Sequence, residues 1–136
     1  ARAAIVLVDV WQWTPFCFLV LLAGLSALPE EVYEAAVLDT SSGWDIFRFV
    51  TLPLLSPVLF TVIMLRLVEA FKMLDIPFSL TNGGPGAATQ TMSFYIYLTG
   101  LRNFNQGYAS AMAYFLLIAM MIIAMIFFRR MRQNFD

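Results

Sequence analysis

Residue types on which many enzymes depend are missing or scarce in this chain of 136 residues. It contains no His and a single Cys, Cys17. Without His or a second Cys, no disulfide can form within the chain, and the common metal and nucleophile arrangements are excluded. The Gly-x-x-x-x-Gly-Lys-Ser/Thr loop that binds nucleotide phosphates is also absent. We therefore expect no catalytic residue and no metal site, and we interpret Cys17 as a small apolar filler.

Charged residues are scarce as well. They make up 12% of the chain, against 61% hydrophobic residues, whereas soluble domains average about a quarter charged and half apolar. The apolar residues gather in three runs, at 5–28, 54–76 and 108–128, and a helix needs about 20 residues to cross a bilayer. The sequence predicts an all-α membrane protein with three transmembrane helices.

The orientation of the chain follows from its Lys and Arg residues, which favour the cytoplasmic side. Arg129, Arg130 and Arg132 come directly after the last apolar run. We therefore expect a cytoplasmic C-terminus. Counting back along the helices, connection 29–52 should lie inside and connection 77–107 outside.

The inner connection is predicted to form two short helices. Pro29 suits a first helical turn, and Glu30 and Glu31 suit the positive end of the helix dipole. Ser42 and Asp45 have the spacing of a capping box for the second helix. Pro53 and Pro57 should mark the entry to the next transmembrane helix.

The outer connection contains a dense turn signal, followed by a helical pattern. The turn consists of Asn82, Gly83, Gly84, Pro85 and Gly86. Its glycines permit positive φ angles. Between residues 94 and 104, apolar residues recur at i, i+3, i+4 and i+7, which predicts a short amphipathic helix along the outer membrane surface.

Four stretches resemble one known family. Residues 34–57 (EAAVLDTSSGWDIFRFVTLPLLSP) are similar to the EAA loop in the membrane subunits of binding-protein-dependent ABC importers. Residues 9–16 (DVWQWTPF), 80–97 (LTNGGPGAATQTMSFYIY) and 105–114 (NQGYASAMAY) resemble the sugar-type permeases specifically. The likeness covers nearly the whole chain, with the motifs in the expected order.

The resemblance implies that a short helix of this loop docks into a cleft of a separate ATPase subunit. The implied coupling residues are Glu34, Ala35, Ala36, Asp39, Thr40, Gly43, Leu52 and Pro53. Where the family has a glycine hinge, this chain has Thr40, and we expect side-chain hydrogen bonds around it to preserve the bend. The alternative is a helix that merely lies on the membrane, but such helices are usually rich in Lys and Arg on their polar face, and this one is acidic.

The implied protein is a bacterial or archaeal inner-membrane permease of roughly six helices, of which this chain would be the C-terminal part. It would import a sugar or sugar-like solute and bind no cofactor, with ATP and Mg on the partner chain. The implied partners are ABC ATPase subunits, a second permease subunit, an extracytoplasmic solute-binding protein and lipid, but no nucleic acid. The alternatives are a permease for a non-sugar solute and a fragment of an ATP-independent secondary transporter.

Ionisable residues at membrane depth are costly and therefore indicate function. Polar and aromatic residues share one face in each of the first two apolar runs, and we expect them to line a translocation path: Asp9, Gln12, Trp13, Phe16, Arg66 and Glu69. Arg66 and Glu69 have the spacing of a direct pair, which could equally be structural. We expect Lys72 and Asp75 to extend toward the membrane surface.

Overall fold

The computed structural model describes residues 1–135, so Asp136, the last residue of the range assigned to the permease, lies outside it. The described residues form helices and connecting loops without a strand. The chain divides into two compact units. The first unit comprises Ala1–Trp13 and the chain from Met64 onward, and the second comprises Thr14–Ile63.

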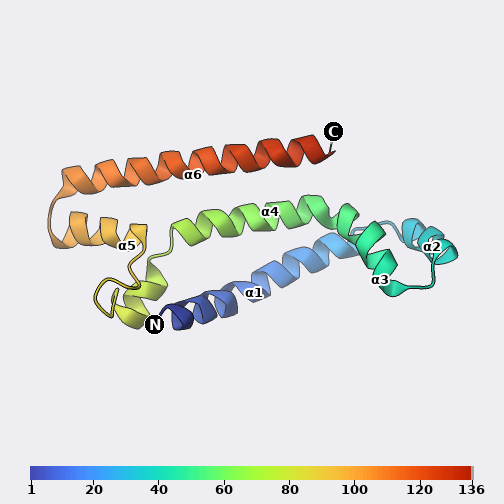
Figure 1. Ribbon diagram of the computed structural model, residues 1–136, viewed down its shortest axis with the longest axis horizontal. Coiled ribbons are helices and arrows are strands. Elements are labelled where there is room, and N and C mark those ends of the chain that lie inside the picture. Colours follow the sequence, from blue (N-terminus) through green and yellow to red (C-terminus); the bar gives the residue numbers. More distant parts are fainter. Residues whose placement is uncertain (136) are drawn as a thin grey trace. The chain divides into compact units, whose positions relative to one another are not determined.

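Within the described residues, three helices are long and apolar enough to cross a membrane, which confirms the predicted number. They are α1 (Arg2–Ser26), α4 (Leu52–Phe71) and α6 (Gln106–Phe135) (Figure 1). In the most apolar window of α6 no residue is buried. A helix so apolar and so exposed is suited to lipid or further protein rather than to water.

The boundaries of these helices differ from the predicted ones. The second helix ends at Phe71 instead of residue 76, and Lys72 begins a turn. The third helix extends past 128 to Phe135, since its Arg, Met and Gln residues favour helix as much as the apolar run does.

The entry to the second membrane helix also differs from the prediction. The π-helical segment η1 (Phe47–Thr51) joins α3 (Gly43–Ile46) to α4, so one helix runs from Gly43 to Phe71. Pro53 is the second residue of α4, at its start as predicted, whereas Pro57 lies inside this helix. A proline cannot donate to the carbonyl four residues earlier, and a widened π turn accommodates the missing bond.

The bend before this helix is made without a left-handed residue. The helix α2 (Glu30–Asp39) has Pro29 at its N-cap, one position before the first turn in which it was predicted, and Thr40 at its C-cap (Figure 1). Thr40 has φ −149° and ψ 145°, an extended conformation that any residue adopts. Its hydroxyl accepts a hydrogen bond from the Ser42 N–H at 3.2 Å. The predicted capping box is wrong, because Ser42 occupies the N-cap of α3 but makes no side-chain cap bond.

Connection 77–107, which was predicted to lie outside, contains helical segments. It contains η2 (Pro77–Thr81), α5 (Met92–Tyr97) and η3 (Leu98–Arg102), which confirms a helical segment in the predicted place. Phe94 on α5 is 1% exposed, and its ring lies 6.3 Å from that of Phe78. Aromatic packing therefore fixes this connection.

The predicted turn takes the backbone angles expected of its glycines. Asn82 has φ 50°, Gly83 has φ 83° and Gly86 has φ 60°. The hydroxyl of Thr89 donates to the carbonyl of Gly84 at 2.8 Å, and the Thr89 N–H donates to the carbonyl of Gly83 at 3.2 Å. These bonds close the turn on itself.

The two positive-φ glycines should differ in their tolerance of a methyl group. A Cβ on Gly83 would lie 2.7 Å from the ring of Phe94, whereas one on Gly86 would meet nothing within 4 Å. Gly83→Ala adds overpacking to backbone strain and should cost about 2–4 kcal/mol, against about 1 kcal/mol for Gly86→Ala. Thermal unfolding of the purified transporter measures both, and equal shifts in the midpoint would contradict this packing.

Candidate functional site

Asp9 and Arg66 form an ion pair in the first unit. The guanidinium Nη2 of Arg66 donates to the Asp9 carboxylate, and the two side chains are only 22% and 15% exposed. The guanidinium also lies over the ring of Trp13, 4.7 Å from its centroid. Asp9 and Trp13 are one turn apart on α1 and so share a face. Together they hold Arg66 through a carboxylate and an aromatic ring.

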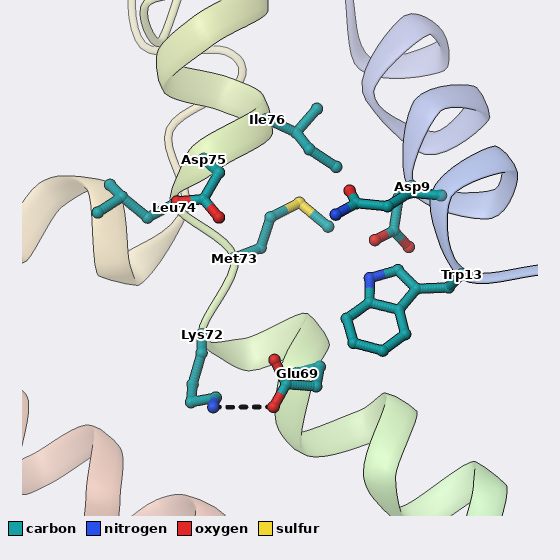
Figure 2. Close-up of a pocket in the computed structure, with 9 residues that line it drawn as sticks. Asp9, Trp13, Glu69, Lys72, Met73, Leu74, Asp75 and Ile76 are labelled. Carbon is teal, nitrogen blue, oxygen red and sulfur yellow. Dashed lines mark ion pairs between the residues drawn. The ribbon is translucent and has the colours of Figure 1, made fainter. Parts of the chain in front are cut away.

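The predicted pairing of Arg66 with Glu69 is wrong. Glu69 instead pairs with Lys72, three residues later, at 2.8 Å (Figure 2). The physical reason is that Asp9 and Trp13 hold the guanidinium on the α1 side. Arg66 thus pairs with a residue of another helix, whereas Glu69 and Lys72 pair with each other at the end of α4.

A cavity of about 70 Å³ lies beside these charges. It is lined by Asp9, Gln12, Trp13, Glu69, Lys72, Met73, Leu74, Asp75 and Ile76 (Figure 2). Four of the six residues predicted for the translocation path are in this set. Arg66 contacts two of the lining residues. Phe16 is absent from the lining and is 40% exposed.

Sequence reasoning missed one wall of the cavity, segment 73–76, because nothing in an apolar run signals where the helix ends. Hydrogen bonds from connection 77–107 hold this wall. The hydroxyl of Thr91 donates to the carbonyl of Met73 at 2.5 Å and accepts from the N–H of Phe94 at 3.1 Å. The hydroxyl of Ser93 donates to the carbonyl of Phe71 at 3.1 Å. The end of α4 and the start of α5 are thus tied together.

The second unit contains the segment predicted to couple to an ATPase. The hydroxyl groups of Tyr33 on α2 and Thr51 on η1 are 2.8 Å apart, and Thr51 is buried. This bond joins the two helices across the bend. Tyr33 and Thr51 were not among the predicted coupling residues, although a Tyr and a Thr in so apolar a segment are natural hydrogen-bonding partners.

A cleft of about 350 Å³ lies at the bend. Its lining residues are Ala36, Asp39, Thr40, Asp45, Ile46, Phe49 and Val50. Of the predicted coupling residues, Ala36 is buried in this cleft, and Asp39 and Thr40 also line it. The others are exposed: Glu34, Ala35, Gly43, Leu52 and Pro53.

The segment around the bend combines exposed apolar side chains with acidic residues. Leu38 is 88% exposed, and Trp44 and Phe49 are also largely exposed. The acidic residues between 30 and 50 are Glu30, Glu31, Glu34, Asp39 and Asp45. Arg48 is the one base in that range, and its guanidinium lies over the Phe49 ring at 5.6 Å. An exposed apolar patch with acidic neighbours suits contact with another protein.

The whole chain, residues 1–136, matches the family described as binding-protein-dependent transport system inner membrane component. It is 41% identical to the trehalose/maltose transport system permease protein MalF of Thermococcus litoralis, over 96% of this chain and 45% of that protein. It is 36% identical to the sulfoquinovosyl glycerol transport system permease protein SmoG of Agrobacterium fabrum, over 98% of this chain and 44% of that protein.

A third relative is the trehalose transport system permease protein SugA of Mycobacterium tuberculosis, with 34% identity over 92% of this chain and 40% of that protein. The chain thus spans a little under half the length of these relatives. The family match and the three membrane-length helices agree on a multi-pass membrane protein. The resemblance noted in the sequence is confirmed, and the chain belongs to the family of binding-protein-dependent transport system inner membrane components.

Proposed function

We propose that this chain is part of a permease subunit of an ATP-driven importer for a sugar or a sugar-like solute. A separate ATPase subunit hydrolyses ATP with Mg and drives the permease through residues 30–51. The family match supports the class. The names of the relatives, which refer to trehalose, maltose and a sulfoquinovosyl glycoside, support a sugar-type solute.

The observation that carries the coupling is the continuity of the helix from Gly43 to Phe71. An ATPase that pushes on α3 moves the start of a membrane-length helix with no loop between to absorb the displacement. The hydrogen bond between Tyr33 and Thr51 attaches α2 to the same helix. The segment therefore has what a coupling element needs, which is rigidity and an exposed contact face.

The polar cavity of the first unit supports a solute path. The carboxylates of Asp9 and Glu69 can accept hydrogen bonds from sugar hydroxyls. The ring of Trp13 offers a flat apolar surface, and the amide of Gln12 both donates and accepts. We assign these residues and Arg66 to the translocation path. The alternative is a purely structural role for the ion pairs. In that case, substitution of these residues would lower uptake only by lowering the amount of assembled protein.

The family match supports the remaining partners that we propose. A second permease subunit and the rest of this permease complete the pathway, because three helices cannot enclose one. A solute-binding protein delivers the solute at the outer connection 77–107, and the C-terminus with Arg129 and Arg130 lies in the cytoplasm. The packed aromatic core around Phe94 gives the binding protein a preformed surface.

Site-directed crosslinking tests the docking directly. In a Cys17→Ala background, Leu38→Cys places a thiol at a position that is 88% exposed on α2. We expect it to crosslink to the ATPase subunit in membranes containing the complete transporter. Leu101→Cys, at a position 64% exposed in the outer connection, is the control and should not react with that subunit. Crosslinking at position 101 but not at 38 would overturn the docking and the orientation together.

A further inference from the structure

The cavity of the first unit has an uneven balance of charges. Asp9, Glu69 and Asp75 supply three carboxylates, against the two cations Arg66 and Lys72. Each cation is already held, Arg66 by Asp9 and Lys72 by Glu69. Among the described residues, the Asp75 carboxylate has no salt-bridge partner. Figure 2 shows Asp75 and Asp9 on elements that approach the cavity from different sides.

This arrangement determines which solute charge the cavity accepts. Both cations already have a carboxylate partner, and the one guanidinium nitrogen without a hydrogen bond, Nη1 of Arg66, is buried. A carboxylate, sulfonate or phosphate group would therefore have to displace Asp9 from Arg66 or Glu69 from Lys72. It would also face the unpaired Asp75. Because Asp75 is exposed, this repulsion between like charges is moderate, and it acts in the same direction. An anionic solute is therefore disfavoured on both counts.

An uncharged hydroxylated solute meets no such obstacle. Hydroxyl groups donate hydrogen bonds to carboxylate oxygens that are already ionised, and no charge has to be displaced. A volume of about 70 Å³ holds a few waters or one hydroxylated edge of a sugar. Trp13 contributes an aromatic wall to the same cavity.

We propose that this cavity binds the hydroxylated edge of an uncharged sugar and excludes acidic sugars, with Asp9 and Asp75 as the residues that set this selectivity. Asp9 acts by neutralising Arg66, and Asp75 acts by leaving a net negative charge. The proposal rests on the proposed function as a sugar permease, and it adds the charge class of the solute.

The test compares two matched pairs of probes, trehalose and maltose and the uronic acid of each. Equilibrium binding of the labelled probes is measured on the assembled transporter without solute-binding protein and without ATP. We expect at least one neutral disaccharide to bind and both acids to bind at least about tenfold more weakly. Equal or tighter binding of the acids, or binding of neither neutral sugar, would overturn the proposal.

Asp75→Asn supplies the variant for this test. Asp75 is exposed and makes no ion pair with the described residues, so the substitution should leave folding intact. It should improve the binding of the acids relative to the neutral sugars by about three- to tenfold. Asp39→Asn, the same change of net charge in the coupling segment, is the control and should leave the ratio unchanged.

If the ratio of acid binding to neutral-sugar binding is unchanged in Asp75→Asn, or changes equally in Asp39→Asn, the assignment of selectivity to the cavity is overturned. Because the assay requires no ATP hydrolysis, a failure of coupling through residues 30–51 leaves the binding result unaffected. The proposed function and the selectivity can therefore fail separately.

Discussion

Asp9→Ala is expected to cost the assembled transporter about 3 kcal/mol of stability. The substitution removes the carboxylate partner of Arg66, whose side chain is only 22% exposed. Breaking one side of a buried ion pair is far more costly than the pair is worth, because the remaining charge stays unpaired. The Nη1 atom of Arg66 is buried and already lacks a hydrogen-bonding partner, so it does not compensate for the bond that Nη2 loses with Asp9.

The measurement is the thermal midpoint and the yield of the transporter in detergent, by size-exclusion chromatography after heating. Arg66→Met combined with Asp9→Ala removes both charges and should recover most of the loss. Glu69→Ala is the matched control, because Glu69 and Lys72 are 37% and 51% exposed, and exposed pairs contribute about 0–1 kcal/mol. Equal losses for Asp9→Ala and Glu69→Ala would show that the Asp9–Arg66 pair is not structural.

Glu34→Lys is expected to reduce both solute uptake and transport-stimulated ATP hydrolysis at least about tenfold. Glu34 is exposed on α2, so the change should not disturb folding. It places a cation on an acidic surface that we assign to the ATPase contact, and a misplaced charge at such an interface costs several kcal/mol. Both rates are measured on the complete transporter in proteoliposomes.

Arg102→Glu is the control for this prediction, because it reverses a single exposed charge in the other connection. Its ATP hydrolysis per solute transported should stay at the level of the unmodified protein. The amount of each variant in the membrane is determined by immunoblot. Normal coupling in Glu34→Lys at normal protein levels would refute the assignment of α2 to the docking surface.

The number of membrane helices could be predicted from the sequence because spanning a bilayer requires a long uninterrupted apolar run. The helix ends could not. Phe71 ends α4 although apolar residues continue beyond it. At the break, the carbonyls of Phe71 and Met73 accept hydrogen bonds from Ser93 and Thr91 in connection 77–107. The pattern of apolar residues in one segment does not predict such hydrogen bonds from a distant segment.

The bend at Thr40 shows a second limit of sequence reasoning. A glycine expected at a hinge suggests a left-handed backbone, but Thr40 is extended, with φ −149°. The substitution that stood out in the sequence therefore carries no conformational cost at this position. The spacing of Ser42 and Asp45 also fits a capping box, yet the Thr40 hydroxyl takes the hydrogen bond from the Ser42 N–H.

The charges in the membrane helices show a third limit. Their presence at helical spacing directed the prediction to the region where a polar cavity lies, because ionisable residues at that depth are rare. Their partners depend on which helix lies alongside. Arg66 selects Asp9, 57 residues away in the sequence, over Glu69 on its own helix. A spacing rule identifies pairs within one helix and cannot rank them against a neighbour from another.

The assignment to an ATP-driven importer is tested most directly by solute uptake in proteoliposomes. These contain the complete transporter with its ATPase and solute-binding subunits, and labelled trehalose and maltose serve as probes. We expect accumulation of at least one sugar when ATP and Mg are supplied on the ATPase side, and none when ATP is replaced by a non-hydrolysable analogue. Accumulation driven by an ion gradient without ATP would contradict the assignment.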